Sequence, residues 1–112
     1  MNAPWQPWRR MAEGLPAWLA SLTGQSMDLE TRLSRARFRA WHRGTREADY
    51  MIGGFFDRYH SEWDDVALSW FEALLDEDDV DVMAWALQAQ PVPAEYAGRL
   101  MLALQRLDYV NV

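Results

Sequence analysis

The residues best suited by type and spacing to binding chemistry are the seven in the run Arg43-Gly44-Thr45-Arg46-Glu47-Ala48-Asp49. Arg43 and Glu47 stand four residues apart, and Gly44 lies between them. Arginine binds carboxylates and phosphates in a bidentate fork, and glycine lets a partner backbone approach closely because it has no Cβ atom. The chemistry alone leaves two interpretations open. One is a helix corner with a local ion pair worth at most about 0.5 kcal/mol, and the other is a patch that binds a partner.

An arginine stripe leads into this segment, with its members at helical spacing: Arg32, Arg35, Arg39 and Arg43. Residues at this spacing share one side of a helix, where like charges repel by a few tenths of a kcal/mol per pair. The stripe is either an ordinary solvated face or a surface that binds carboxylates or phosphates. The second possibility includes a nucleic-acid backbone.

The acidic run Asp76-Glu77-Asp78-Asp79-Val80-Asp81 lacks the central glycine and the distal glutamate of a calcium loop. We therefore expect no metal there, but a turn between helices in which Asp79 caps the next helix. The sequence has no cysteine, and its two histidines, His42 and His60, are isolated. With no nucleophile, base and orienting group in view, we expect no enzymatic activity and no cofactor of the chain's own.

The 112 residues include seven tryptophans and carry a formal net charge of −6. Trp63 and Trp70 fall on a predicted core stripe. Trp41 lies off the apolar stripe of its helix, so it either packs under the next helix or presents a face to a partner. All 11 basic residues are arginine, with eight in residues 1–46 against three acids, and three in residues 47–112 against 14 acids. Such a chain meets a charged partner or folds one half against the other.

Apolar periodicity predicts an all-α fold, a small five-helix bundle over residues 28–112. Asp28 is the expected N-cap of a first helix that ends near His42, with a stripe of Leu29, Leu33, Ala36 and Ala40. Gly44 interrupts the pattern. A second helix carries the apolar stripe Ala48, Met51, Ile52, Phe55, Phe56 and Tyr59, with Gly53 and Gly54 on its other face.

Ser61 is the expected N-cap of a third helix, whose stripe is Trp63, Val66, Ala67, Trp70, Phe71, Leu74 and Leu75. A short fourth helix is expected around Val82–Leu87, and Pro93 suits the first position of a fifth. Residues 1–27, with three prolines and two glycines, read as a poorly ordered leader. No apolar run is long enough to span a bilayer and no signal peptide is evident, so we expect a cytoplasmic protein rather than one of the mitochondrial matrix.

The run from Arg43 to Asp49 resembles the Arg-Gly-x-x-Glu motif of the SdhE-like succinate dehydrogenase assembly factors. The similarity continues through Phe55-Phe56, Leu74-Leu75, the acidic turn Asp78-Asp79-Val80-Asp81 and Trp85. It spans about residues 33–107. The sequence departs from the family pattern at Val80, where proline is common, and at Gly53-Gly54, where bulkier residues are common.

The resemblance implies a non-enzymatic factor that binds the flavoprotein subunit of succinate dehydrogenase, or of fumarate reductase, and promotes covalent attachment of FAD to it. FAD then belongs to that client, and we expect the free chain to be monomeric. The implied partner-binding residues are Arg43, Gly44, Thr45, Arg46, Glu47 and Asp49. Secondary candidates are Arg39, Trp41, Phe56, Asp78 and Asp79. The alternative is a small nucleic-acid-binding or regulatory module that uses the arginine stripe, against which stand the net negative charge and the lack of lysine.

Overall fold

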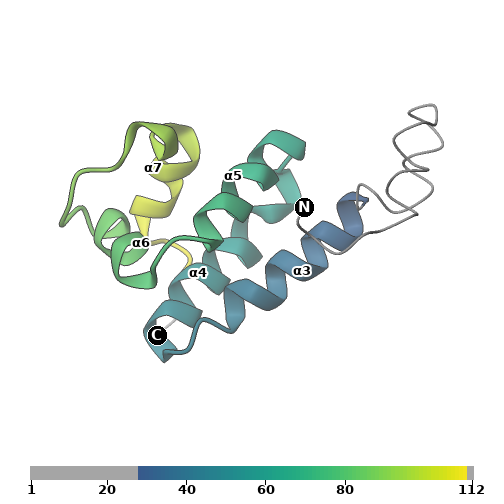
Figure 1. The fold of residues 1–112 in the computed structure, drawn as a ribbon, viewed down its shortest axis with the longest axis horizontal. Coiled ribbons are helices and arrows are strands. Elements are labelled where there is room, and N and C mark those ends of the chain that lie inside the picture. The colour runs from purple at the N-terminus through teal and green to yellow at the C-terminus, as the bar shows by residue number, and fades with distance from the viewer. Residues whose placement is uncertain (1–27, 111–112) are drawn as a thin grey trace, which may run out of the picture. The chain divides into compact units, whose positions relative to one another are not determined.

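The structure is a computed structural model that describes residues 28–110, and the expectations for the leader lie outside these residues. Five α-helices follow one another: α3 (Leu29–Trp41), α4 (Arg46–Tyr59), α5 (Asp65–Leu75), α6 (Asp79–Ala86) and α7 (Arg99–Arg106). Two short 3-10 helices span His60–Glu62 and Ala94–Tyr96 (Figure 1). The described range contains no strand, and the predicted all-α five-helix fold is confirmed.

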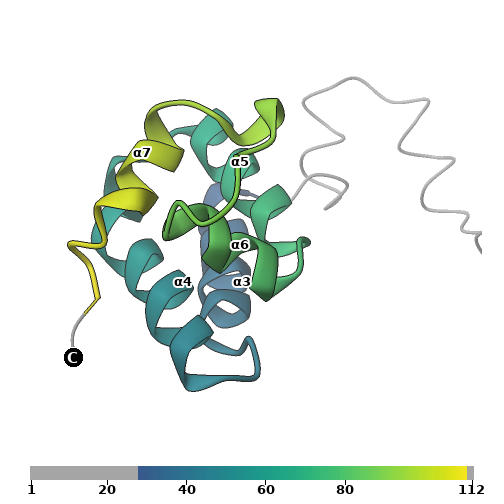
Figure 2. The same cartoon turned by 90° about the vertical axis from the view of Figure 1, so that its left-hand side faces the viewer.

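One compact unit begins at Leu33, within α3. Figure 2 shows its helices from a second side, with α6 in front of α3. Within residues 28–110, no helix is both long and apolar enough to cross a membrane.

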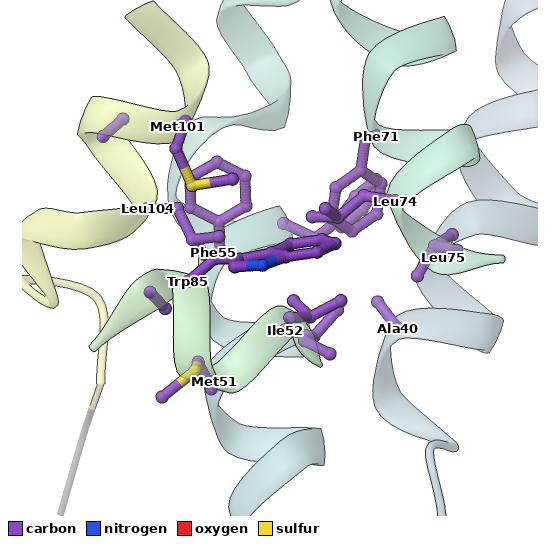
Figure 3. Packing of buried hydrophobic residues seen from close by; sticks show 14 of the residues in the cluster. Ala40, Met51, Ile52, Phe55, Phe71, Leu74, Leu75, Trp85, Met101 and Leu104 are labelled. Carbon is purple, nitrogen blue, oxygen red and sulfur yellow. The ribbon is translucent and has the colours of Figure 1, made fainter. Parts of the chain in front are cut away.

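The core of this unit is built around α4, whose predicted stripe from Ala48 to Phe56 is buried. Phe55 is fully buried and its ring lies 6.0 Å from that of Phe71 and 5.4 Å from that of Tyr109. Trp85 of α6 and Leu104 of α7 close the same cluster (Figure 3). Each such side chain contributes about 1.5–3 kcal/mol to the free energy of folding when it is removed from water. The apolar face of α4 is therefore the central part of the core, against which side chains of the other helices pack.

Side-chain caps mark the starts of three helices. The Asp28 carboxylate accepts the Thr31 N–H at 2.8 Å, as predicted, and this hydrogen bond holds the pKa of Asp28 below its ordinary value. Thr45 caps α4 by accepting the Ala48 N–H at 3.2 Å. The predicted cap Ser61 is wrong: it lies in a 3-10 helix, and Asp64 caps α5 through the Ala67 N–H at 2.8 Å.

Two other predicted starts also differ from the structure. Asp79 is the first residue of α6 and Asp78 occupies the cap position, without a side-chain capping bond. Pro93 precedes the 3-10 helix Ala94–Tyr96, and α7 begins only after Gly98. The Asp79 carboxylate instead accepts a hydrogen bond from the Arg43 side chain.

Two residues of the predicted stripes are exposed, Leu29 at 44% and Val66 at 74%, while Leu68 is fully buried. Gly53 was expected on the outer face of its helix, but it is buried. A Cβ atom at Gly53 would lie 2.3 Å from Cδ2 of Trp41. The indole of Trp41 thus packs directly on the α4 backbone, as the first of its two predicted alternatives has it.

Candidate functional site

The predicted binding segment, residues 43–49, forms the bend between α3 and α4 together with the first turn of α4, and we call this segment the corner. Gly44 has φ +111°, a conformation that side-chain-bearing residues rarely adopt. The Arg43 N–H donates to the Asp49 carboxylate at 2.6 Å, across the corner. Together with the Thr45 cap, this bond fixes the path of the backbone between the two helices. Asp49 is therefore a structural member of the segment.

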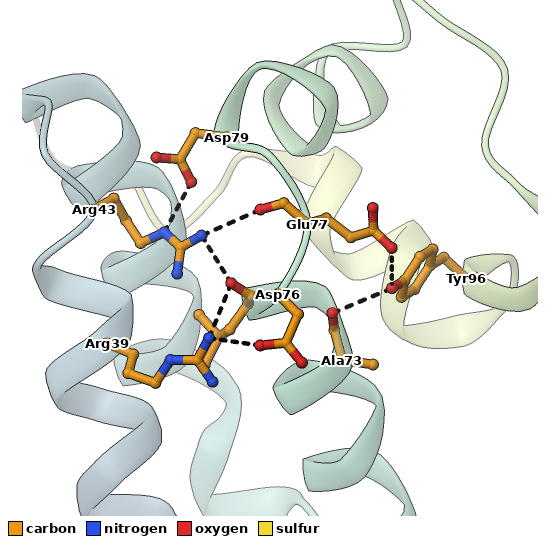
Figure 4. Close-up of polar contacts among 8 residues, drawn as sticks. Arg39, Arg43, Ala73, Asp76, Glu77, Asp79 and Tyr96 are labelled. Carbon is orange, nitrogen blue, oxygen red and sulfur yellow. Dashed lines mark hydrogen bonds and ion pairs between the residues drawn. The ribbon is translucent and has the colours of Figure 1, made fainter. Parts of the chain in front are cut away.

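Arg43 points its guanidinium group toward the acidic turn that follows α5. Its Nε donates to Asp79 at 2.8 Å, and its Nη2 donates to the carbonyl oxygens of Leu75 at 2.9 Å and Glu77 at 3.3 Å (Figure 4). The Arg43 side chain is only 11% exposed, and that of Asp79 is 26% exposed. The spacing of the motif suggests an ion pair with Glu47, but the structure pairs Arg43 with Asp79.

Arg39, one turn earlier on α3, contacts the same turn. Its Nη2 lies 2.7 Å from the Asp76 carboxylate and 3.2 Å from the Leu75 carbonyl oxygen. The last carbonyl groups of a helix have no partner within the helix, and they form the negative end of its dipole. α5 has no basic residue in its own last turn. Arg39 of α3 and Arg43, which follows that helix, therefore supply the positive charge that completes the C-terminus of α5.

Tyr96 holds the turn from the opposite side, as Figure 4 shows. Its hydroxyl oxygen lies 2.6 Å from the Glu77 carboxylate and 3.2 Å from the Ala73 carbonyl oxygen, and it can donate to one of them at a time. Burial, reinforced by the Glu77 carboxylate, raises the pKa of Tyr96 above its ordinary value. The hydroxyl is a donor at neutral pH, as an ordinary tyrosine is, and the raised pKa extends this state to more alkaline solution.

The charge split of the sequence is thus resolved partly within the molecule, since the basic half folds against the acidic half at this turn. Two of the four stripe arginines, Arg39 and Arg43, already bind the protein's own carboxylates and carbonyl groups. The stripe does not present a row of four guanidinium groups to a phosphate backbone. Among the described residues, no group of three or more acidic or histidine side chains is arranged to hold a metal ion.

The outward side of the corner consists of Gly44, Thr45, Arg46 and Glu47, all exposed. An atom added at Gly44 in the Cβ position would meet nothing within 4 Å, so its outer side is open. The side chains of Arg46 and Glu47 make no hydrogen bond or ion pair within residues 28–110, whereas Arg43 and Asp49 are turned to internal contacts. The motif is therefore divided into an inner pair that shapes the corner and an outer group that faces away from it.

The secondary candidates are divided in the same way. Phe56 is 1% exposed and stacks on His60, with ring centroids 4.5 Å apart, so its side chain belongs to the core and its partner-binding role stays a prediction. Asp79 and Arg39 belong to the polar contacts just described, and Asp78 is exposed. Trp41 is half-buried against Gly53.

Trp41 also lines two hollows beside the corner. One, of about 540 Å³, is bounded further by Tyr50, Gly54 and Tyr109. The other, of about 300 Å³, lies along α3 next to Phe38 and His42. We call the exposed residues around these hollows, Phe38, His42 and Tyr50 together with the Trp41 ring, the aromatic groove. The sequence offered no pattern for it, because Phe38 and Tyr50 lie outside the apolar stripes.

Residues 34–108 match the model of a family described as the flavinator of succinate dehydrogenase. The chain belongs to this family. The match contains the corner, the acidic turn and Trp85, and its limits agree with those of the resemblance seen in the sequence. Because it covers the five helices almost completely, the family assignment applies to the folded unit as a whole.

Two relatives with curated names share 35% identity with this chain. "FAD assembly factor SdhE" of Acetobacter pasteurianus aligns over 83 residues, which are 73% of this chain and 76% of that protein. The mitochondrial "succinate dehydrogenase assembly factor 2" of Mycosarcoma maydis aligns over 68 residues, which are 61% of this chain. The chain spans only 29% of the fungal protein's length. No solved structure matches the chain significantly.

Proposed function

We propose that this protein promotes the covalent attachment of FAD to the flavoprotein subunit of succinate dehydrogenase, or of the related fumarate reductase, by binding that subunit through the corner between α3 and α4. The observation that carries the proposal is the placement of the family motif. Its residues form a corner that is held rigidly from inside while Gly44, Arg46 and Glu47 are exposed. The names of the relatives, an FAD assembly factor and a succinate dehydrogenase assembly factor, support the same role.

In this proposal the protein contributes position rather than a reacting group. Holding reactants in a competent geometry lowers a barrier by several kcal/mol without any catalytic side chain on the helper. FAD and the side chain to which it becomes attached both belong to the client. The chain has no cofactor of its own and stabilises one arrangement of the client by binding it more tightly than the others.

The residues of the motif take different parts in this mechanism. Arg43 and Asp49 are positioning residues, since their polar groups are used to hold the corner. Arg46 and Glu47 are the proposed contact residues. Gly44 leaves room for the client backbone, since any side chain there would project into the open space outside the corner.

The test is to co-express the flavoprotein subunit with variants of this protein in cells that lack an assembly factor of this family. Covalent flavin is then read as in-gel fluorescence of the denatured subunit. Arg46→Glu and Glu47→Lys reverse the two exposed charges of the corner. We expect both to lower the fluorescence strongly, while the wild-type chain restores it.

Arg99→Glu is the matched control, because Arg99 is likewise the exposed first residue of its helix. An acidic residue is favourable in the first turn of a helix, so neither Arg46→Glu nor Arg99→Glu should destabilise the fold. Flavin attachment that is equally strong with the wild-type chain, Arg46→Glu and Arg99→Glu would refute a role of the corner. Attachment that does not depend on the wild-type chain at all would refute the function.

A further inference from the structure

The aromatic groove borders the corner at both of its ends. Trp41 and His42 immediately precede Arg43, and Tyr50 immediately follows Asp49. The Trp41 and Tyr50 rings meet edge to face with centroids 6.2 Å apart. Tyr50 stands four residues after Arg46 on α4, so these two exposed side chains lie on the same side of that helix.

Two aromatic side chains of the groove are unusually accessible. Phe38 is 64% exposed and stacks on His42, with ring centroids 4.0 Å apart, and Tyr50 is 44% exposed. The His42 ring is itself fixed by a 2.6 Å contact between its Nδ1 and the Phe38 carbonyl oxygen. The rings are thus held in place before any partner arrives, and a preorganised surface loses little conformational entropy on binding.

The corner alone is too small and too polar to bind a protein tightly. A stable interface uses about 20–30 residues on each side, whereas the outward side of the corner offers Gly44, Thr45, Arg46 and Glu47. Exposed charges of this kind add about 0–1 kcal/mol each and act mainly on the rate and register of association. Affinity comes from buried aromatic or aliphatic anchors that sit in hollows. The groove supplies hollows of about 540 and 300 Å³ beside the corner.

We propose that the aromatic groove is the anchoring half of the same interface, and that it receives an aliphatic or aromatic side chain from the surface of the flavoprotein subunit. This inference rests on the function proposed above. The charged rim of the groove fits this occupant. Arg37 and Asp57 lie 3.8 Å apart, and Arg58 and Asp108 lie 3.9 Å apart.

Both ion pairs of the rim are longer than a hydrogen bond and exposed. Asp108 also accepts the Tyr59 hydroxyl at 2.8 Å, whereas Arg37 and Asp57 are able to re-form their contacts with polar groups around an apolar anchor. The groove is formed by side chains outside the family motif.

The experiment measures the affinity of the purified, flavin-free flavoprotein subunit for the full-length chain by titration calorimetry. Phe38→Ala and Tyr50→Ala remove the two exposed rings, and alanine is at least as favourable as either residue in a helix, so the fold is retained. Trp41 is left intact because it packs on Gly53. We expect each variant to raise the dissociation constant by about tenfold or more, with an unchanged thermal midpoint. Leu102→Ala on α7, where the leucine is 61% exposed, is the matched control and should bind as the wild type does.

A photo-reactive phenylalanine analogue placed at position 38 should form a crosslink to the subunit, and the same analogue at position 102 should not. Suppose that the wild-type chain binds, that Arg46→Glu weakens binding, and that Phe38→Ala and Tyr50→Ala change the dissociation constant less than twofold. The assignment of the groove as an anchoring site is then refuted, and the proposed function stands. If the wild-type chain does not bind the subunit, the proposed function fails and the groove assignment fails with it. Loss of affinity in the two groove variants, with the crosslink at position 38, supports the inference.

Discussion

Replacement of Gly53 by alanine tests whether the contact between Trp41 and α4 positions the groove. Glycine in the middle of a helix normally costs about 1 kcal/mol relative to alanine, so Gly53→Ala should stabilise an unconstrained helix by about that amount. Gly53 is buried, however, and the added Cβ atom would lie 2.3 Å from Cδ2, 2.5 Å from Cε2 and 2.8 Å from Cγ of Trp41. These separations are far below a carbon–carbon contact distance of about 3.5–4.0 Å.

The indole cannot relieve this clash by a small rotation, because Cγ is joined directly to the Trp41 Cβ atom. The whole ring has to leave its place on α4. Overpacking of a well-packed site costs about 1–3 kcal/mol. Since the three contacts involve the inner atoms of the ring, we expect the upper part of that range. After the gain in helix propensity, Gly53→Ala should lower the free energy of unfolding by about 2 kcal/mol.

The assay is equilibrium urea unfolding followed by far-UV circular dichroism, for the wild type, Gly53→Ala, Trp41→Ala and the double variant. In the Trp41→Ala background the ring is absent, so Gly53→Ala should reverse its sign and stabilise by about 1 kcal/mol. The coupling between the two sites is then about 3 kcal/mol. If Gly53→Ala stabilises the wild type, or destabilises both backgrounds equally, Trp41 does not pack on Gly53.

Three further predictions concern the acidic turn, a helix cap and the response to alkali. Asp79→Asn should lower the free energy of unfolding by about 1–3 kcal/mol in urea titrations, because it removes the charge that faces the Arg43 side chain, which is only 11% exposed. Asp78 is exposed, so Asp78→Asn should change the free energy of unfolding by about 0.5 kcal/mol or less. Asp64→Ala should cost about 0.5–2 kcal/mol in the same assay and Ser61→Ala almost nothing, because Asp64 accepts the N-terminal N–H of α5. Burial and a neighbouring carboxylate raise the pKa of Tyr96 in the folded protein. As the pH rises past about 10, the unfolded chain therefore loses the hydroxyl proton before the folded protein does, and the free energy of unfolding should fall from that pH upward. Tyr96→Phe should flatten that alkaline decline in thermal scans across pH, and an unaltered decline would contradict the assignment.

The sequence predicted the helices well wherever apolar periodicity decided the outcome. The stripe of α4 from Ala48 to Phe56 was predicted and is buried, because apolar side chains at helical spacing share one face that packs into the core. The start of α5 was predicted wrongly because Ser61 and Asp64 are both good caps by type. Tertiary packing decides between them: Trp63 lies against Phe55 and Phe56, with centroids 5.7 Å from each, and the chain reaches that position through a 3-10 turn.

The candidate site was located by its motif, but its internal contacts were not. Rules for residues four apart consider one helix only, and so they pair Arg43 with Glu47. The actual partner, Asp79, is 36 positions away in the sequence. Likewise, the burial of Gly53 depends on how the ring of Trp41 lies across the α3–α4 pair. A single sequence contains no signal for such a contact between helices.

The division of the motif changes how a loss of activity at each position should be read. Arg43 completes the C-terminus of α5 and binds Asp79 while its own N–H holds the corner to Asp49, so its removal disturbs the acidic turn and the corner together. An Arg43 variant that fails to promote flavin attachment therefore does not identify Arg43 as a contact residue, because a displaced corner gives the same result. The Arg46 side chain makes no hydrogen bond or ion pair with any of the described residues. A contact role of Arg46 is established if an Arg46 variant loses affinity for the subunit while its free energy of unfolding is unchanged. A positioning role of Arg43 requires that the affinity and the free energy of unfolding fall together, and that a change which restores one also restores the other.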